Sequence, residues 1–316
     1  MFQWFTGKVA YLSTWFGFKI GCGVVKVLPR TVFWISDRLA TIGYLFFRGF
    51  RHRSVANIRD ALGDRLGDAA IEAVARRSLR NFFRCCVESL IAIDASNDEL
   101  RDTIALVGRD YLDAALAKGN GVVLLSAHLG NFFLVGLRLA LEGHPSFVLV
   151  NQPRDGRFAE LMDDYRLQVR QRTIHARPRR DALRELHGVL RQNQVVVMIA
   201  DEFRRGSGIE VPFFGGNVIA RRGPVTLALR TGAAIVPACL VRQANDSLKL
   251  IIEPELELDR SGKGSAQITE NTVRMTQWLE RTVRAYPDQW NWMNIRHWTN
   301  QREQVVNRQQ RLRRAV

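Results

Sequence analysis

The middle of the chain alternates between short apolar runs and longer segments with helical periodicity. Continuous apolar runs, which are typical of strands buried on both faces of a sheet, lie at 122–125, 147–150, 195–199, 235–240 and 248–252. Between several of these runs, helical segments are expected at 158–172 and 180–191. Strands that alternate with helices predict an α/β fold with a mixed, largely parallel central sheet covered by helices.

The first fifty residues have a different pattern, with two long apolar stretches, 9–28 and 31–50, that meet at Pro29. Each is close to the length of about 20 residues that crosses a bilayer. Both carry charged residues: Lys19 and Lys26 in the first, Asp37 and Arg38 in the second. One ionised side chain in mid-bilayer costs on the order of 2.5–3.5 kcal/mol. We therefore predict amphipathic helices that lie on a membrane surface; a pair of buried core helices, or one true span in the first stretch, remains an alternative.

The region from 54 to 93 is helical in pattern, with Asp68 as the expected N-cap of its second part. These residues are expected to serve packing. The segment from 299 onward is polar and rich in Arg and Gln. The predicted organisation is therefore a membrane-associating segment at 1–53, an α/β domain at 54–298 and a basic tail at 299–316.

The composition adds a strong positive charge, because 46 Lys and Arg face 31 Asp and Glu, a net charge of +15. Such a surplus attracts nucleic acid, anionic lipid headgroups or an acidic carrier protein. The basic run Arg48, Arg51, His52 and Arg53 follows the apolar stretches and could touch anionic headgroups. No nucleic-acid motif is present, so we favour an anionic membrane surface as partner and expect no nucleic acid.

Four cysteines stand at positions 22, 85, 86 and 239 without a CxxC spacing. They indicate a reducing, cytosol-facing compartment, and no secretion signal is evident. No cluster has metal-ligand spacing, and no Walker A, GxGxxG or GxSxG pattern occurs. We therefore expect neither a metal site nor a bound cofactor.

The strongest candidate for chemistry is His128, in the segment SAHLGNFF directly after the predicted strand 122–125. Ligands in open α/β sheets bind beyond the carboxyl ends of strands. Imidazole is also the side chain best suited to accept a proton near neutral pH. The alternative is that His128 caps the following helix, predicted at 132–141, or satisfies buried backbone groups.

Four blocks in order resemble the bacterial lipid A lauroyl/myristoyl acyltransferase family, part of the wider glycerolipid acyltransferase group. The first is HLGNFF at 128–133, where the family has His, four intervening residues and an acid. The others are IADE with GIEVPFFG at 199–202 and 208–215, the segment 220–237, and YPDQWNW at 286–292. The resemblance covers nearly the whole chain.

The resemblance implies an acyltransferase at the cytoplasmic face of a bacterial inner membrane. His128 would take a proton from a hydroxyl, or an amine, of a lipid or glycolipid acceptor such as a lipid A precursor. That group would then attack an acyl thioester carried by acyl carrier protein or coenzyme A, with no cofactor. Gly130 and Asn131 of the same block would contact substrate.

The chain departs from the family at Phe133, which stands where the acid is expected. Losing the orienting acid of a comparable triad costs roughly 10⁴-fold in rate. We expect Asp201 or Glu202 to replace it, because both follow the strand 195–199 and should reach the same sheet edge as His128. Glu202 is favoured for its longer side chain. The alternative is a protein without catalysis that binds lipid or acyl carrier protein.

Arginines in the predicted loops are expected to bind the phosphate or carboxylate groups of substrates. Arg221, Arg222 and Arg154 are the main candidates, and the first two precede a helix start at Gly223–Pro224. For each single arginine, a solvated basic surface is the alternative. The remaining candidates are Arg157, Arg177, Arg179, Arg180, Arg204 and Arg205.

Overall fold

The computed structural model describes residues 2–29, 31–151, 156–203, 208–262 and 264–294. Its centre is a seven-stranded sheet in the order β1-β9-β8-β2-β5-β3-β4, beside a two-stranded hairpin, β6-β7. Only the β8–β9 pair of the large sheet is antiparallel. The strands are β1 Ile104–Val107, β2 Val122–Ser126, β3 Ser146–Val150, β4 Gln171–His175, β5 Val195–Ile199, β6 Ile209–Phe213, β7 Gly216–Ala220, β8 Ala234–Arg242 and β9 Leu248–Ile252.

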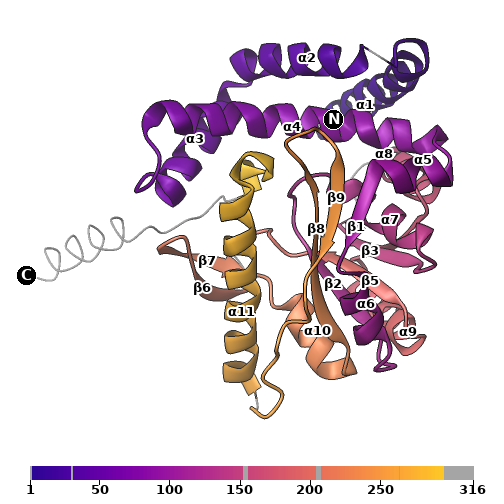
Figure 1. Ribbon diagram of the computed structural model, residues 1–316, viewed down its shortest axis with the longest axis vertical. Helices are drawn as coiled ribbons and strands as arrows, with labels where there is room; N and C mark the ends of the chain where they lie inside the picture. Colours follow the sequence, from indigo (N-terminus) through magenta and orange to yellow (C-terminus); the bar gives the residue numbers. More distant parts are fainter. Residues whose placement is uncertain (1, 30, 152–155, 204–207, 263, 295–316) are drawn as a thin grey trace, which may run out of the picture.

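Eleven α-helices and three short 3₁₀ helices accompany these strands in the described part of the chain (Figure 1). The helices of the N-terminal third are α1 Phe2–Val27, α2 Val32–Phe46, α3 Arg48–Leu62, α4 Asp68–Asp94 and α5 Asn97–Thr103. Those that follow are α6 Arg109–Leu116, η1 Phe132–Leu134, α7 Val135–Leu141, α8 Gly156–Gln168, α9 Arg179–Arg191, α10 Gly223–Thr231, α11 Gly264–Ala285, η2 Pro287–Gln289 and η3 Trp292–Asn294.

Alternation along β2 shows how the sheet is buried between two helical layers. Val123 and Leu125 belong to one apolar core, together with buried residues of α9, α10 and α11. Val122 and Leu124 belong to a second core, with residues of α6, α7 and α8. Both faces of the strand are thus covered by apolar side chains, which explains why its sequence is continuously apolar rather than alternating. The predicted mixed, largely parallel sheet covered by helices is confirmed.

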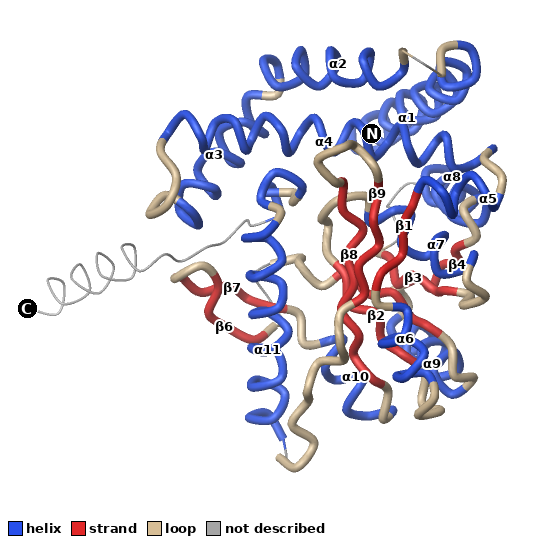
Figure 2. The backbone as a smooth tube through the Cα atoms, in the orientation of Figure 1, coloured by secondary structure: helices blue, strands red, loops and turns tan. Residues whose placement is uncertain are grey.

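The N-terminal helices lie at the carboxyl end of the central strands (Figures 1 and 2). Helix α2 packs on α4, and its buried residues Ser36, Ala40 and Tyr44 recur at helical spacing. Its other side stays exposed, including Trp34 and Ile42. Among the described residues, no helix combines the length and the apolar character that crossing a bilayer requires.

Two predicted helix ends need correction. Helix α8 ends at Gln168 rather than 172, because Arg170 has a positive φ of 57° and the chain turns into the edge strand β4. Helix α4 begins at Asp68 with Gly67 as its N-cap, and the Asp68 carboxylate accepts a hydrogen bond from Arg59 instead of capping the helix. The domain boundary expected at 53–54 falls inside α3. The predicted basic tail, 299–316, lies outside the described residues.

Candidate active site

The register of two neighbouring strands brings His128 and Asp201 together. Strands β2 and β5 are parallel, and Ser126 at the end of β2 pairs with Ile199 at the end of β5. His128 and Asp201 each follow that pair by two residues. They therefore leave the sheet side by side at its carboxyl edge, as expected for a site in an open α/β fold.

Three N–H groups surround the Asp201 carboxylate. The imidazole Nδ1 of His128 lies 2.7 Å from Asp201 Oδ1. The backbone N–H of His128 donates to Oδ2 at 2.8 Å, and the indole Nε1–H of Trp290 donates to the same oxygen at 2.7 Å. Asp201 is fully buried, whereas a quarter of the His128 side chain is exposed. Asp201 is thus the buried member of the pair, oriented by its hydrogen bonds, and His128 is the member that is partly exposed to solvent.

These contacts determine the charge of the carboxylate. Burial acts to raise the pKa of Asp201, but His128, the Trp290 N–H and the His128 backbone N–H outweigh it and hold that pKa below its ordinary value. An ionised carboxylate only accepts hydrogen bonds, so Nδ1 of His128 carries the proton of this contact. In the neutral imidazole, Nε2 is then the basic nitrogen.

The loop that carries His128 is held on several sides. Gly130 has a φ of +57°, and an added Cβ would lie 2.0 Å from the Leu240 carbonyl oxygen, so only glycine fits there. Its N–H donates to the Gln289 carbonyl, and the Asn131 N–H donates to the Leu240 carbonyl. The Asn291 N–H donates to the carbonyl of His128 itself. The loop is therefore fixed to β8 and to the segment 289–291.

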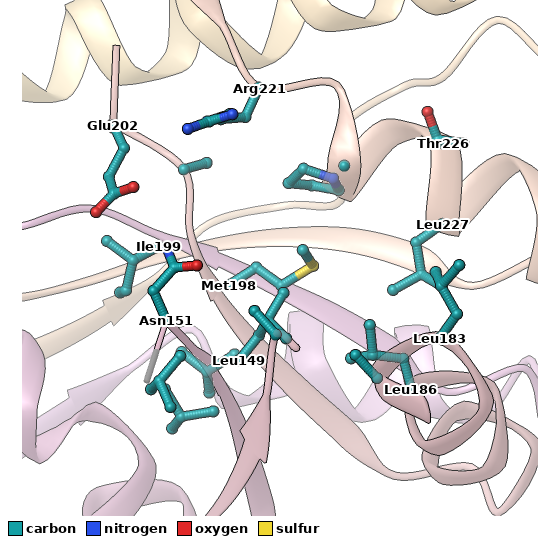
Figure 3. A pocket seen from close by; sticks show the side chains of 18 of the residues that line it. Leu149, Asn151, Leu183, Leu186, Met198, Ile199, Glu202, Arg221, Thr226 and Leu227 are labelled. Atoms are coloured by element: carbon teal, nitrogen blue, oxygen red, sulfur yellow. The ribbon is translucent and has the colours of Figure 1, made fainter. Parts of the chain in front are cut away.

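A pocket of about 770 Å³ opens beside His128. Its lining changes in character from one side to the other, with Glu202 and Arg221 on one side and Leu183, Leu186 and Leu227 grouped on the other (Figure 3). The apolar floor comes from β3, β5, α9 and α10. The arginines in its lining are Arg166, Arg177, Arg179, Arg221, Arg222 and Arg230.

Phe133 lines the same pocket and belongs to an aromatic wall beside the imidazole. The Phe132 ring meets the His128 ring edge-on at 4.8 Å between centroids, and the Phe133 ring lies 4.1 Å from Phe132. An apolar ring thus stands where the resemblance led us to expect an acid, and the carboxylate beside the imidazole comes from Asp201, which follows β5.

The expectation of a carboxylate from the strand 195–199 is met by Asp201, although Glu202 was favoured. Strand register already brings the backbones of His128 and Asp201 together, so the short side chain of Asp201 reaches Nδ1 and no longer arm is needed. Glu202 lines the pocket.

The other predicted site residues divide into three groups. Arg221 and Arg222 line the pocket directly before α10, which begins at Gly223 as expected. Asn131 is buried and its side-chain amide donates to Glu88 of α4. These contacts favour a role in holding the loop over the predicted contact with substrate. Gly130 shares that role. Arg154, with Arg204 and Arg205, lies outside the described residues.

Sequence reasoning missed Trp290, Arg166 and Arg230. Trp290 lies in the block 286–292, but nothing in the sequence indicates that its N–H would reach Asp201, 89 positions away. In the part of the chain that the structure describes, no group of three or more His, Cys, Asp or Glu could hold a metal ion.

Comparison with known proteins gives one family and several relatives. The family model for bacterial lipid A biosynthesis acyltransferases matches residues 1–299. A phosphatidylinositol mannoside acyltransferase of Mycolicibacterium smegmatis is 25% identical over 284 residues, 87% of this chain and 88% of the relative. One from Mycobacterium tuberculosis is 36% identical over 135 residues, 41% and 42% of the two chains. The lipid A biosynthesis palmitoleoyltransferase of Escherichia coli K12 is 24% identical over 292 residues, 90% and 91%.

Proposed function

This chain belongs to the bacterial lipid A biosynthesis acyltransferase family, and we propose that it moves a fatty acyl group from a thioester to a hydroxyl of a membrane glycolipid, with His128 as the general base and Asp201 as its orienting acid. The observation that carries this proposal is the contact of 2.7 Å between His128 Nδ1 and the buried, ionised carboxylate of Asp201. His128 itself lines the large pocket.

The proposed reaction uses Nε2 of His128, the nitrogen on the far side of the ring from Asp201. Nε2 takes the proton of the acceptor hydroxyl while the hydroxyl oxygen attacks the thioester carbonyl carbon. The C–S bond of the resulting tetrahedral intermediate breaks, and the imidazolium returns its proton to the leaving thiolate. Asp201 stabilises the imidazolium and keeps its ring oriented without taking the proton itself.

The pocket suits substrates with one apolar and one anionic part. Its volume of about 770 Å³ lies within the roughly 300–1,000 Å³ of ordinary small-molecule sites. Leu183, Leu186 and Leu227 would hold the acyl chain. Arg221 and Arg222 would bind a phosphate of the donor or of the acceptor headgroup, since guanidinium groups match phosphate geometry. One relative is named as a phosphatidylinositol mannoside acyltransferase and another as a palmitoleoyltransferase of lipid A biosynthesis.

The exposed surface of α1 and α2 supports a position on an anionic bilayer, at the cytoplasmic face of the inner membrane. Its large apolar side chains are exposed, and basic side chains lie among them. Among the described side chains, the apolar members are Phe16, Ile20, Val27, Trp34, Leu39, Ile42, Leu45 and Phe46, and the exposed basic members are Lys19, Lys26 and Arg38. Because this surface lies beyond α4, on the side where β2 and β8 end (Figure 1), lipid substrates would reach the site from the membrane.

The test is acyl transfer by purified protein, with acyl carrier protein and coenzyme A thioesters offered separately and glycolipid acceptors in vesicles. His128→Ala should lower the transfer rate by at least about 10³-fold, because the proton acceptor is lost. His144→Ala is the matched control, since His144 pairs with Asp113 outside the pocket. Wild-type transfer by His128→Ala would refute the proposed base.

Phe133 favours one alternative, a protein that binds acyl donor or lipid without transferring it. That alternative predicts tight binding of the thioester, no acylated product with either donor, and no effect of His128→Ala. Formation of acylated lipid by the wild-type protein excludes it.

A further inference from the structure

A buried polar cluster lies behind the His128 loop, outside the pocket. It joins Glu88 and Ser89 of α4, Asn131 of the loop and Arg242 at the end of β8. All except Arg242 are less than 9% exposed as whole residues, and the Arg242 side chain is 9% exposed. None of the four lines the pocket. Buried polar groups are costly unless they are paired, so their contacts indicate what the cluster does.

Asn131 is bound by α4 through its side chain. Its amide Nδ2 donates to Glu88 Oε2 at 2.8 Å and to the Cys85 carbonyl at 3.3 Å. Ser89 Oγ lies 3.5 Å from its Oδ1. The two strongest contacts of the amide therefore come from one turn of α4, and the Asn131 side chain connects the loop to that helix.

Glu88 is held in turn by Arg242, whose Nη2 lies 2.6 Å from Glu88 Oε1. The backbone N–H of Arg242 donates to Gln289 Oε1, and its carbonyl accepts from Gln289 Nε2, both at 2.8 Å. The carbonyl of Gln289 accepts from Gly130 N–H. The Glu88 carboxylate thus connects α4 to β8 and to the His128 loop. Gln289 connects β8 to the same loop a second time.

From these contacts we propose that Glu88 is a positioning residue for the proposed base: it fixes Asn131, and through Asn131 it holds the loop that sets the distance between His128 and Asp201. This proposal rests on the proposed function. Glu88 touches neither the pocket nor the imidazole, so its removal should change the rate of the chemical step more than substrate binding.

The experiment is a comparison of kcat and KM. Glu88→Ala should lower kcat by ~10²-fold, as a displacement of about 1 Å in a catalytic group does, while KM for donor and acceptor changes by less than about threefold. A double variant, Glu88→Gln with Arg242→Gln, should recover kcat to within about fivefold of wild type, since a glutamine oxygen still accepts from Asn131 and no buried charge is left unpaired.

Glu142→Ala is the matched control, because it breaks a similar, largely buried pair with Arg138 away from the loop. Its kcat per folded molecule should equal that of wild type. Asn131→Ala cuts the same link while leaving the Glu88–Arg242 pair intact, and it replaces Glu88→Ala if that variant does not fold. A wild-type kcat in Asn131→Ala, or an equal fall in Glu142→Ala, would overturn the positioning role.

The failure of the proposed function has a different signature. If His128→Ala transfers acyl groups at the wild-type rate, the base assignment fails and the positioning role fails with it. If His128→Ala is inactive while Glu88→Ala and Asn131→Ala keep wild-type kcat, the positioning role alone is contradicted.

Discussion

At the scale of single residues, three N–H groups hold the fully buried Asp201 carboxylate ionised, although no Lys or Arg of the described residues forms an ion pair with it. Trp290 supplies one of the three and is itself completely buried. The indole N–H of Trp290 and the backbone N–H of His128 both donate to Asp201 Oδ2. Oδ1 therefore accepts from the imidazole. The orientation of the base thus depends on a tryptophan as well as on the acid.

Trp290→Phe removes that donor while keeping an aromatic ring. We expect a loss of about 1–3 kcal/mol in the free energy of unfolding, since a buried acceptor loses a partner. We also expect a fall of roughly tenfold in kcat as the His128–Asp201 geometry loosens. Trp278→Phe is the control, because the Trp278 N–H donates at 3.0 Å to Glu253, a different carboxylate. Equal kcat values in the two variants would show that the Trp290 contact is not specific to the site.

At the scale of elements, α2 has one anchored side and one exposed side. Asp37, whose charge argued against a membrane span, accepts two hydrogen bonds from the buried Arg84 of α4, each at 2.7 Å. Burial acts to raise the pKa of Asp37, but Arg84 and Arg80 outweigh it and lower that pKa. The charged residue therefore attaches α2 to the protein, and apolar side chains such as Ile42 and Leu45 remain for a lipid surface.

Replacing Ile42 and Leu45 by Glu should weaken binding to anionic vesicles by about tenfold per residue, since each buried aliphatic side chain contributes about 1.5–3 kcal/mol. Co-sedimentation with vesicles measures the change. Tyr111→Glu on α6 is the control, because it also charges an exposed apolar position but lies away from α1 and α2. Unchanged vesicle binding in the Ile42/Leu45 variant would contradict a membrane role for α2.

The elements also show what the sequence can predict. The five strands with continuous apolar runs were predicted to within about two residues at each end, because burial on both faces leaves an unambiguous signal. The edge strands β1 and β4 were missed, because β1 is apolar but only four residues long and β4, QRTIH, is mostly polar. The β6–β7 hairpin and the 22-residue helix α11 were also not predicted, although α11 buries residues such as Trp278.

At the scale of the whole molecule, the proposed site and the proposed membrane surface lie at the same end of the sheet. Helix α4 packs against α2 on one side and reaches the His128 loop through Glu88 on the other. The sequence predicted His128 and a carboxylate after the strand 195–199, because both follow buried strands. It could not rank Asp201 above Glu202, because that depends on the register between β2 and β5 and on Trp290, which are long-range features.

The most direct test of the His128–Asp201 pair compares kcat for Asp201→Asn and Glu202→Gln, two neighbouring substitutions that each remove one negative charge at nearly constant shape. The His128–Asp201 pair predicts a fall of roughly 10⁴-fold for Asp201→Asn, as for the acid of a comparable triad, and a far smaller change for Glu202→Gln. Near-wild-type turnover by Asp201→Asn, or a larger fall in Glu202→Gln, would contradict it.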